Sequence, residues 1–310
     1  MCLRCGEGRR YRLPRLAFIL IPGLIPGLIA GTTLYKGISM RVAFVMAAIL
    51  FCAPVFAQGV KLPSVTNSIG MELIEIPAGK FTMGIPVGEK GRQENEAQIT
   101  VTLIKPFSLG KTEVTQGQWK QVMGTEPWKS KDFVKADKDD PATYVSWDDA
   151  TAFCQNLTEI ERKAGKLKAD EEYRLATEAE WECACRAGTT TAYSFGDDEK
   201  QLGEYVWFNG NSENVDEEYA HKVGLKKPNP WGLYDMHGNV FEWCSDRYGE
   251  ALSGGVDPIG PNGGSFRVLR GGSWWGDPAG YCRSANRNGN VPSRRRNYLG
   301  FRVARSQVAQ

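Results

Sequence analysis

The stretch from Gly188 to Pro292 has almost no clean hydrophobic periodicity. Glycine, asparagine, aspartate and tryptophan recur in it, and the apolar runs are too short for long helices or strands. Long ordered loops must therefore make up much of the fold. Because an irregular backbone needs tethers, we expect disulfides, buried indoles or bound cations to hold these loops.

Three helix starts are marked clearly before this stretch. Each has a hydroxyl side chain at the expected N-cap and an acid or amide three residues later, which together satisfy free backbone N–H groups. The three pairs are Thr115 with Gln118, Ser146 with Asp149, and Thr177 with Glu180. After Ser146, Ala150, Phe153, Cys154 and Leu157 recur at helical spacing, which predicts a helix face in the core.

Strand patterns also precede the loop-rich stretch. Met71–Ile76 and Lys80–Met83 flank Pro77-Ala78-Gly79 and predict a hairpin. Residues 99–103 alternate between aliphatic side chains and threonine, as a half-buried strand does. No linker and no repeat of fixed period interrupts the region that follows the leader, so we expect one domain over residues 66–306.

The first 57 residues differ in charge from the rest of the chain. They hold seven Lys or Arg and one acid, Glu7, out of 38 basic and 36 acidic residues in the whole chain. The remaining 31 basic and 35 acidic residues give a net charge near −4. A mildly acidic body gives no electrostatic reason to expect a nucleic acid as partner.

The N-terminal region predicts export. Met40 and Arg41, the apolar run after them and the small residue Ala57 have the three parts of a secretory signal peptide, residues 40–57. In one interpretation residues 1–39 come from a start codon placed too early. In the other, the whole N-terminus, residues 1–57, stays uncleaved and anchors the protein in a membrane. The expected location is the periplasm, the medium or the cell surface.

Ordered motifs run from about residue 68 to residue 305. They are Met71–Gly84, Lys111–Thr115, Tyr173–Glu182, Pro228–Met236, Gly238–Trp243, Arg270–Trp274, Cys282–Arg287 and Leu299–Arg302. The set resembles the sulfatase-modifying-factor domain, whose best known members are formylglycine-generating enzymes. The resemblance implies an α+β, C-type-lectin-like variant with short strands and helices and long ordered loops.

The same resemblance bears on copper. Formylglycine-generating enzymes bind Cu(I) through two cysteines of the C-terminal segment, and oxygen then converts a sulfatase cysteine to formylglycine. Soft thiolates select Cu(I), and a linear site needs both. Here Trp274–Asp277 follow the Gly-Gly-Ser turn without a thiol, and Cys282 is the only cysteine in the segment. Copper is therefore not expected, and only two histidines, His221 and His237, are available for an iron site.

Cys282 has two interpretations. If the chain is exported, its cysteines lie in an oxidising compartment, where disulfides persist. The resemblance implies a structural bridge between Cys185 and Cys282. The alternative is that Cys282 is a reactive thiol.

The resemblance also implies a calcium site at Asp235, Gly238, Val240 and Glu242. In the family, two acidic or amide side chains and two main-chain carbonyls bind this ion, and hard oxygen ligands suit Ca²⁺. The alternative is that Asp235 caps a turn and Glu242 is solvated.

Ser273 and Arg287 correspond to residues that line the substrate cleft of catalytic relatives, and Trp274 and Cys282 complete the candidate set. Arg287 could orient a carboxylate or a peptide carbonyl through its planar guanidinium, or it could be a buried structural arginine.

Three functions remain open: a copper oxidase, an enzyme of altered chemistry with a deep polar cleft around Ser273 and Arg287, and a binding module. The binding module would take a protein, peptide or glycan on a shallow aromatic face. The missing second thiol disfavours the oxidase.

Overall fold

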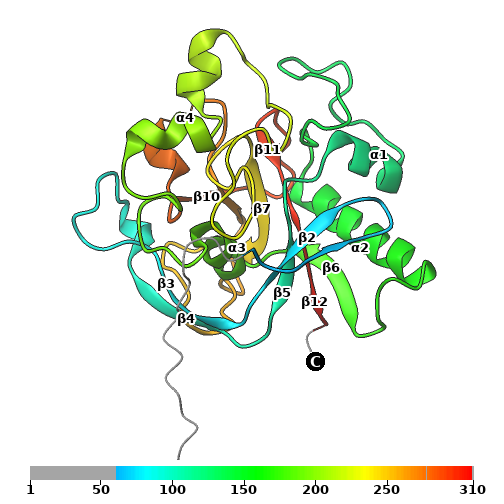
Figure 1. The fold of residues 1–310 in the computed structure, drawn as a ribbon, viewed down its shortest axis with the longest axis horizontal. Coiled ribbons are helices and arrows are strands. Elements are labelled where there is room, and N and C mark those ends of the chain that lie inside the picture. The colour runs from blue at the N-terminus through cyan, green and yellow to red at the C-terminus, as the bar shows by residue number, and fades with distance from the viewer. Residues whose placement is uncertain (1–60, 277, 309–310) are drawn as a thin grey trace, which may run out of the picture. The chain divides into compact units, whose positions relative to one another are not determined.

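The strands form three separate sheets in the part of the chain that the computed structural model describes, residues 61–276 and 278–308 (Figure 1). The five-stranded sheet has the order β1 (Ser64–Thr66), β2 (Glu72–Ile76), β5 (Phe107–Gly110), β12 (Val303–Gln307) and β6 (Glu171–Leu175). The four-stranded sheet has the order β10 (Arg287–Asn290), β9 (Arg267–Arg270), β7 (Phe241–Arg247) and β11 (Leu299–Gly300). The third sheet joins β3 (Gly79–Met83), β4 (Ile99–Leu103) and β8 (Gly255–Val256). The predicted leader and signal peptide lie outside the described residues.

All three predicted capping boxes are confirmed. The α-helices are α1 (Gln116–Met123), α2 (Trp147–Lys163), α3 (Glu178–Arg186) and the single turn α4 (Leu202–Tyr205). Thr115, Ser146 and Thr177 are the N-caps of α1, α2 and α3, and each bonds reciprocally with the residue three positions later. The 3-10 turns are Glu94–Glu96, Glu199–Gln201, Asn209–Asn211, Glu213–Val215 and Ala279–Cys282.

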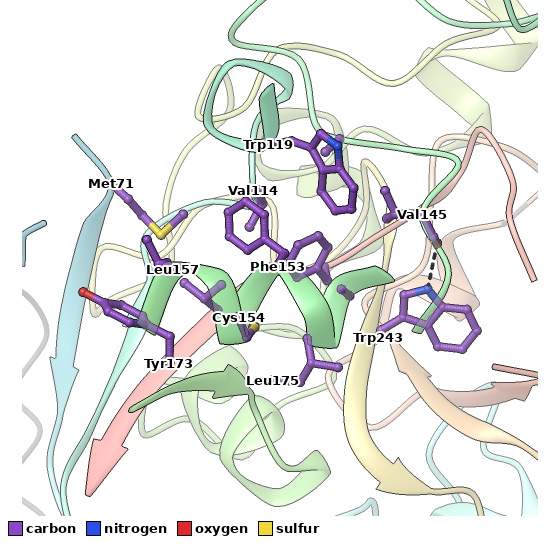
Figure 2. Packing of buried hydrophobic residues seen from close by; sticks show 14 of the residues in the cluster. Met71, Val114, Trp119, Val145, Phe153, Cys154, Leu157, Tyr173, Leu175 and Trp243 are labelled. Atoms are coloured by element: carbon purple, nitrogen blue, oxygen red, sulfur yellow. Dashed lines mark hydrogen bonds between the residues drawn. The ribbon is translucent and has the colours of Figure 1, made fainter. Parts of the chain in front are cut away.

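The predicted apolar face of α2 packs in the core. Phe153, Cys154 and Leu157 point from α2 toward the buried side chains of the neighbouring strands (Figure 2). The ring of Phe153 stacks on Trp119 with a centroid distance of 5.6 Å, and it meets the edge of Phe301 at 5.3 Å. Such aromatic pairs contribute about 0.5–1.5 kcal/mol beyond the area they bury. This cluster joins α1 and α2 to the five-stranded sheet.

The predicted hairpin between residues 71–76 and 80–83 is wrong. Strand β2 pairs with β1 and β5, whereas β3 pairs with β4, so the two segments belong to different sheets. Ile76 lies opposite Phe107 and Gly79 lies opposite Leu103. The chain therefore advances three residues from 76 to 79 but four residues from 103 to 107 on the partner segment. Residues 72–83 therefore form one bent arm of a long antiparallel ribbon with residues 99–110. A local pattern cannot distinguish a bend of this kind from a tight turn, since the partner strand lies elsewhere in the chain.

The predicted long ordered loops are confirmed between α4 and β7. Asn229 is one of their tethers, because its Oδ1 accepts hydrogen bonds from the backbone of Trp231 and Leu233. Its Nδ2 donates to the carbonyls of Ala184 and Cys185 at the end of α3. One buried amide thus closes a turn of the loop and attaches it to a helix, which satisfies buried polar groups that would otherwise destabilise the fold.

Across residues 61–276 and 278–308, no helix has both the length and the apolar character that crossing a bilayer requires.

Candidate functional site

Four buried charges meet where α3 packs against β9 and β10. Arg270 and Arg287 lie directly opposite each other on the two strands, a pairing that destabilises a sheet when it is uncompensated. Glu178 binds Arg287 through two hydrogen bonds of 2.7 Å, and Glu182 binds Arg270. Since Glu178 and Glu182 are four residues apart, they lie on the same face of α3. One helix face therefore neutralises both arginines.

Glu182 also binds the arginine at the end of its own helix. Its Oε1 accepts from Arg186 Nε at 2.8 Å. Burial alone would raise the pKa of Glu182, but the Arg186 and Arg270 charges hold this pKa below its usual value. The carboxylate is therefore ionised in the folded protein, as the ion pairs require.

Arg287 is engaged inside the protein. The residue is 4% exposed, and its Nη1 donates to the carbonyl of Gly249 at 2.7 Å while the guanidinium lies over the Tyr248 ring. It also lines a cavity of about 10 Å³ together with Glu178. A cavity of that size holds at most one water molecule. This geometry is that of a buried structural arginine.

Ser273 and Trp274 follow a sharp turn made by two glycines. Gly272 has φ +76°, and a Cβ there would lie 3.0 Å from the carbonyl oxygen of Tyr281 and 3.1 Å from the Cys282 sulfur. Only glycine fits this backbone without strain. Ser273 Oγ donates to the Trp275 carbonyl at 3.1 Å and accepts from the Trp275 N–H at 3.3 Å. The hydroxyl therefore stabilises its own turn.

Trp274 and Trp275 differ in burial. The indole of Trp274 is fully buried, packs with Ala220 and Val240, and donates to the carbonyl of Asn297 at 3.4 Å. Trp275 is 46% exposed and stacks on Tyr298, with ring centroids 5.0 Å apart and planes 6° from parallel. The exposed feature beside the glycine turn is thus a stacked aromatic pair.

Cys282 is buried beside His237. The backbone N–H of Ser194 donates to His237 Nε2 at 3.0 Å, so the proton of the neutral ring is on Nδ1, which donates to the Cys282 carbonyl at 2.8 Å. Burial lowers the pKa of His237 to about 4, so the ring is neutral at pH 7. This imidazole links the C-terminal segment to the loop around Ser194.

Cys185 also lies beside His237. It is a thiol in the structure, its sulfur is 3.8 Å from both His237 ring nitrogens, and it contacts the Ser284 hydroxyl. Burial raises the pKa of the Cys185 thiol to about 12. The bridge from Cys185 to Cys282 is not formed in this structure, and the pairing stays a prediction.

The two acidic residues of the predicted calcium site, Asp235 and Glu242, lie in one cluster of buried charges that also contains Arg302. Glu242 is fully buried, which excludes the alternative that it is solvated. Its oxygens form an ion pair with Arg302 at 2.6 Å and accept the indole N–H of Trp181 at 2.7 Å. Arg302 also donates to the carbonyls of Gly110 and Tyr234, so this pair ties three segments together.

Asp235 faces a carboxylate that the motif analysis did not single out as a ligand, Glu113. Oδ2 of Asp235 accepts from the Gly224 N–H at 2.8 Å. Asp235 Oδ1 and Glu113 Oε2 are both buried, and among the described residues they have no donor unless the two carboxyl groups share a proton. Burial, and then repulsion from Asp235, raises the pKa of Glu113 well above its usual value. Burial also raises the pKa of Asp235, to about 6.

These observations divide the candidate residues. Gly272 brings Ser273 close to Cys282, whereas Arg287 is bound to α3 through Glu178. Ser273, Trp274, Cys282 and Arg287 are all buried. Sequence reasoning missed Glu178 as the partner of Arg287 and Glu113 as the neighbour of Asp235. Both belong to the quoted motifs, but neither motif indicates a contact more than a hundred residues away.

Comparisons with known proteins agree with this architecture. A family model described as the sulfatase-modifying factor enzyme 1-like domain matches residues 61–307. A formylglycine-generating enzyme of Streptomyces coelicolor is 31% identical over 293 residues, covering 74% of this chain and 88% of that protein. The chain belongs to the sulfatase-modifying-factor family.

Two solved structures share its fold. PvdO from Pseudomonas aeruginosa matches with a TM-score of 0.68 and 29% identity, over 79% of this chain and 98% of that chain. Treponema denticola variable protein 1 matches with a TM-score of 0.67 and 32% identity, over 78% of this chain and 98% of that chain. The predicted α+β, C-type-lectin-like variant is confirmed.

The ion pair of Arg287 can be tested by its stability contribution. Arg287→Met leaves Glu178 buried with a more distant partner, so the free energy of unfolding is expected to fall by about 3 kcal/mol. Adding Glu178→Gln should recover part of this loss, because the remaining charge is removed. Urea denaturation of the two variants measures both effects. Unchanged stability in Arg287→Met would contradict the structural role and favour a ligand-binding one.

Proposed function

We propose that this chain is an exported member of its family that acts as a binding module and not as a copper oxidase. Its ligand is a protein, peptide or glycan, and the contact surface is the aromatic face formed by Trp275 and Tyr298. The proposal rests on the different environments of the residues around the glycine turn. Arg287 and Ser273 bind within the protein, whereas Trp275 presents an indole to solvent.

The polar groups around the turn give little support to an enzyme with a deep cleft. An orienting arginine needs free donors, but the guanidinium of Arg287 is bound by Glu178 and by the Gly249 carbonyl. A general base needs a basic nitrogen, but both nitrogens of His237 are hydrogen-bonded and its pKa is low. A stacked indole instead suits ligands with flat apolar faces, such as sugar rings or proline and aromatic side chains.

The thiols of this chain disfavour a copper oxidase. A linear Cu(I) site requires two sulfur ligands, and the C-terminal segment contains only Cys282. The thiol of Cys185, which lies beside His237, resists ionisation because it is buried. Removal of a proton from such a thiol would add to the cost of binding copper.

Export and copper binding are both tested on protein recovered from outside the cytoplasm. Its N-terminus is expected to be Gln58, the residue after the signal peptide. Titration with Cu(I) in competition with a chelator is expected to show less than one tightly bound equivalent, and a sulfatase peptide should keep its cysteine. Stoichiometric tight copper with formylglycine formation would establish the alternative, an oxidase that modifies sulfatases.

The aromatic face is tested by Trp275→Ala. We expect binding to the best ligand from a glycan and peptide array to weaken about thirtyfold, since an exposed aromatic hot spot contributes about 2 kcal/mol. Phe266→Ala is the matched control, because Phe266 is also 46% exposed but lies outside this face. Equal losses in the two variants, or none in Trp275→Ala, would exclude the Trp275 surface.

Calcium is part of the same proposal. No three His, Cys, Asp or Glu side chains converge as a metal site among the residues described, so the ligand set combines two carboxylates with main-chain carbonyls. Asp235 and Glu113 each have a buried oxygen without a donor, which a divalent cation would satisfy while neutralising their repulsion. The carbonyls of Gly238 and Val240 complete the set. Glu242, the second predicted carboxylate, would have to exchange its bonds to Arg302 and Trp181 for the ion.

Chelation tests the calcium site. EGTA is expected to lower the melting temperature, because an ion bound at a hundred times its Kd contributes about 2.7 kcal/mol. Glu113→Gln should remove this response, because one of the two carboxylate ligands is lost. Glu75→Gln, at an exposed position of β2, should respond to EGTA as the unsubstituted protein does. An EGTA response that survives in Glu113→Gln would remove Glu113 from the site.

A further inference from the structure

Strand β3 forms one edge of the three-stranded sheet, with β4 as its only neighbour in the described sheet order (Figure 1). Immediately after β3, the backbone N–H of Gly84 donates to Glu182 Oε1 at 2.8 Å, on the side facing α3. The Gly84 carbonyl accepts from Arg186 Nη2 at 2.9 Å. Side chains of α3 therefore bind the continuation of this edge.

The rest of the edge is open. Backbone groups of an antiparallel strand alternate between its two sides, so Lys80 and Thr82 direct their N–H and C=O groups to the same side as the Gly84 N–H. No residue from 61 to 276 or from 278 to 308 forms a hydrogen bond with these groups on that side. An edge of this kind is a template for an added strand.

A groove of about 240 Å³ runs along this open edge. It is lined by residues 77–82, by Cys183 and Arg186 of α3, and by Thr189, Thr190 and Trp231. Phe81 packs against the apolar core, whereas Lys80 and Thr82 are exposed. A strand bound here would alternate in the same way, with apolar side chains beside Phe81 and polar ones beside Lys80.

The charges of the groove define its occupant. Its described lining residues include Lys80 and Arg186 and no acid. Arg186 is bound by Glu182 and by the carbonyls of Gly84 and Thr191, while Lys80 forms no ion pair within residues 61–276 and 278–308. A carboxylate opposite Lys80 would make a favourable cross-strand pair.

We propose that the open edge of β3 binds an extended peptide segment that alternates apolar and polar side chains and bears a carboxylate opposite Lys80. The segment adds to the sheet as a fourth strand through the N–H and C=O groups of Lys80 and Thr82. This surface is separate from the aromatic face of Trp275, and the two proposals can fail independently.

The probe is an acetylated and amidated heptapeptide that alternates valine and threonine and has glutamate at its centre. Titrated into the nitrogen-15-labelled full chain, it is expected to shift the backbone amide signals of Lys80 and Thr82. Thr82→Pro removes only an outward N–H, which an edge strand tolerates, and should weaken binding about tenfold. Thr82→Val keeps this N–H and should bind within twofold of the unsubstituted chain.

Lys80→Glu tests the proposal even if Thr82→Pro does not fold, because Lys80 is exposed and its substitution should leave the fold intact. This variant should prefer a probe with central lysine over the glutamate probe, the reverse of the unsubstituted chain. Shifts elsewhere, no saturable binding at millimolar probe, or an unchanged charge preference would each overturn the proposal. So would a dimer, seen by sedimentation, that Thr82→Pro dissociates, since the edge would then bind a second copy of this chain.

Discussion

The pairing of Arg270 with Arg287 across β9 and β10 is the constraint on which the C-terminal half depends. Two guanidinium groups at directly opposed positions repel each other, and both are buried. The strands pair because α3 places Glu178 and Glu182 over them. The helix is held in turn by its capping box, in which Thr177 and Glu180 satisfy the first free N–H groups. The capping box at the start of α3 thus determines whether β9 and β10 can pair. The position of the glycine turn that follows β9 depends on the same pairing.

This arrangement explains why a long irregular region is ordered without regular structure. Buried charges are expensive to desolvate, so each must have its partner in the correct place, and a shifted loop would leave a charge unpaired. The pair of Glu242 with Arg302 acts similarly, since Arg302 also binds the carbonyls of Gly110 and Tyr234. Neutral side chains act in the same way, because Asn229 ties its loop to α3 and His237 joins the loop at Ser194 to the C-terminal segment. Such pairs contribute to a unique arrangement more than to stability, for apolar replacements of buried ion pairs are often as stable.

The sequence predicts those features whose causes are local. Capping boxes, the face of α2 and the alternation of residues 99–103 arise from neighbouring residues, and all are present. The family motifs predict the fold through resemblance, which periodicity could not.

The predicted hairpin at Pro77 is wrong because strand pairing depends on contacts between distant segments, and residues 72–83 pair with residues 99–110. The sequence left both interpretations of Arg287 open for the same reason, because its partner, Glu178, is 109 positions away. Glu113 and Asp235 are likewise far apart in the sequence, so no local pattern predicts that they lie next to each other.

Glu182 connects the two candidate binding surfaces. One carboxylate accepts from the Gly84 N–H after β3, from Arg186 at the end of α3, and from Arg270 at the end of β9. Glu182 therefore holds Gly84, which directly follows the open edge of β3, and Arg270, which directly precedes the turn that presents Trp275. Because the carboxylate is fully buried and ionised, moving either segment would leave a charge or a donor unsatisfied. Glu182 therefore fixes the positions of both segments relative to α3.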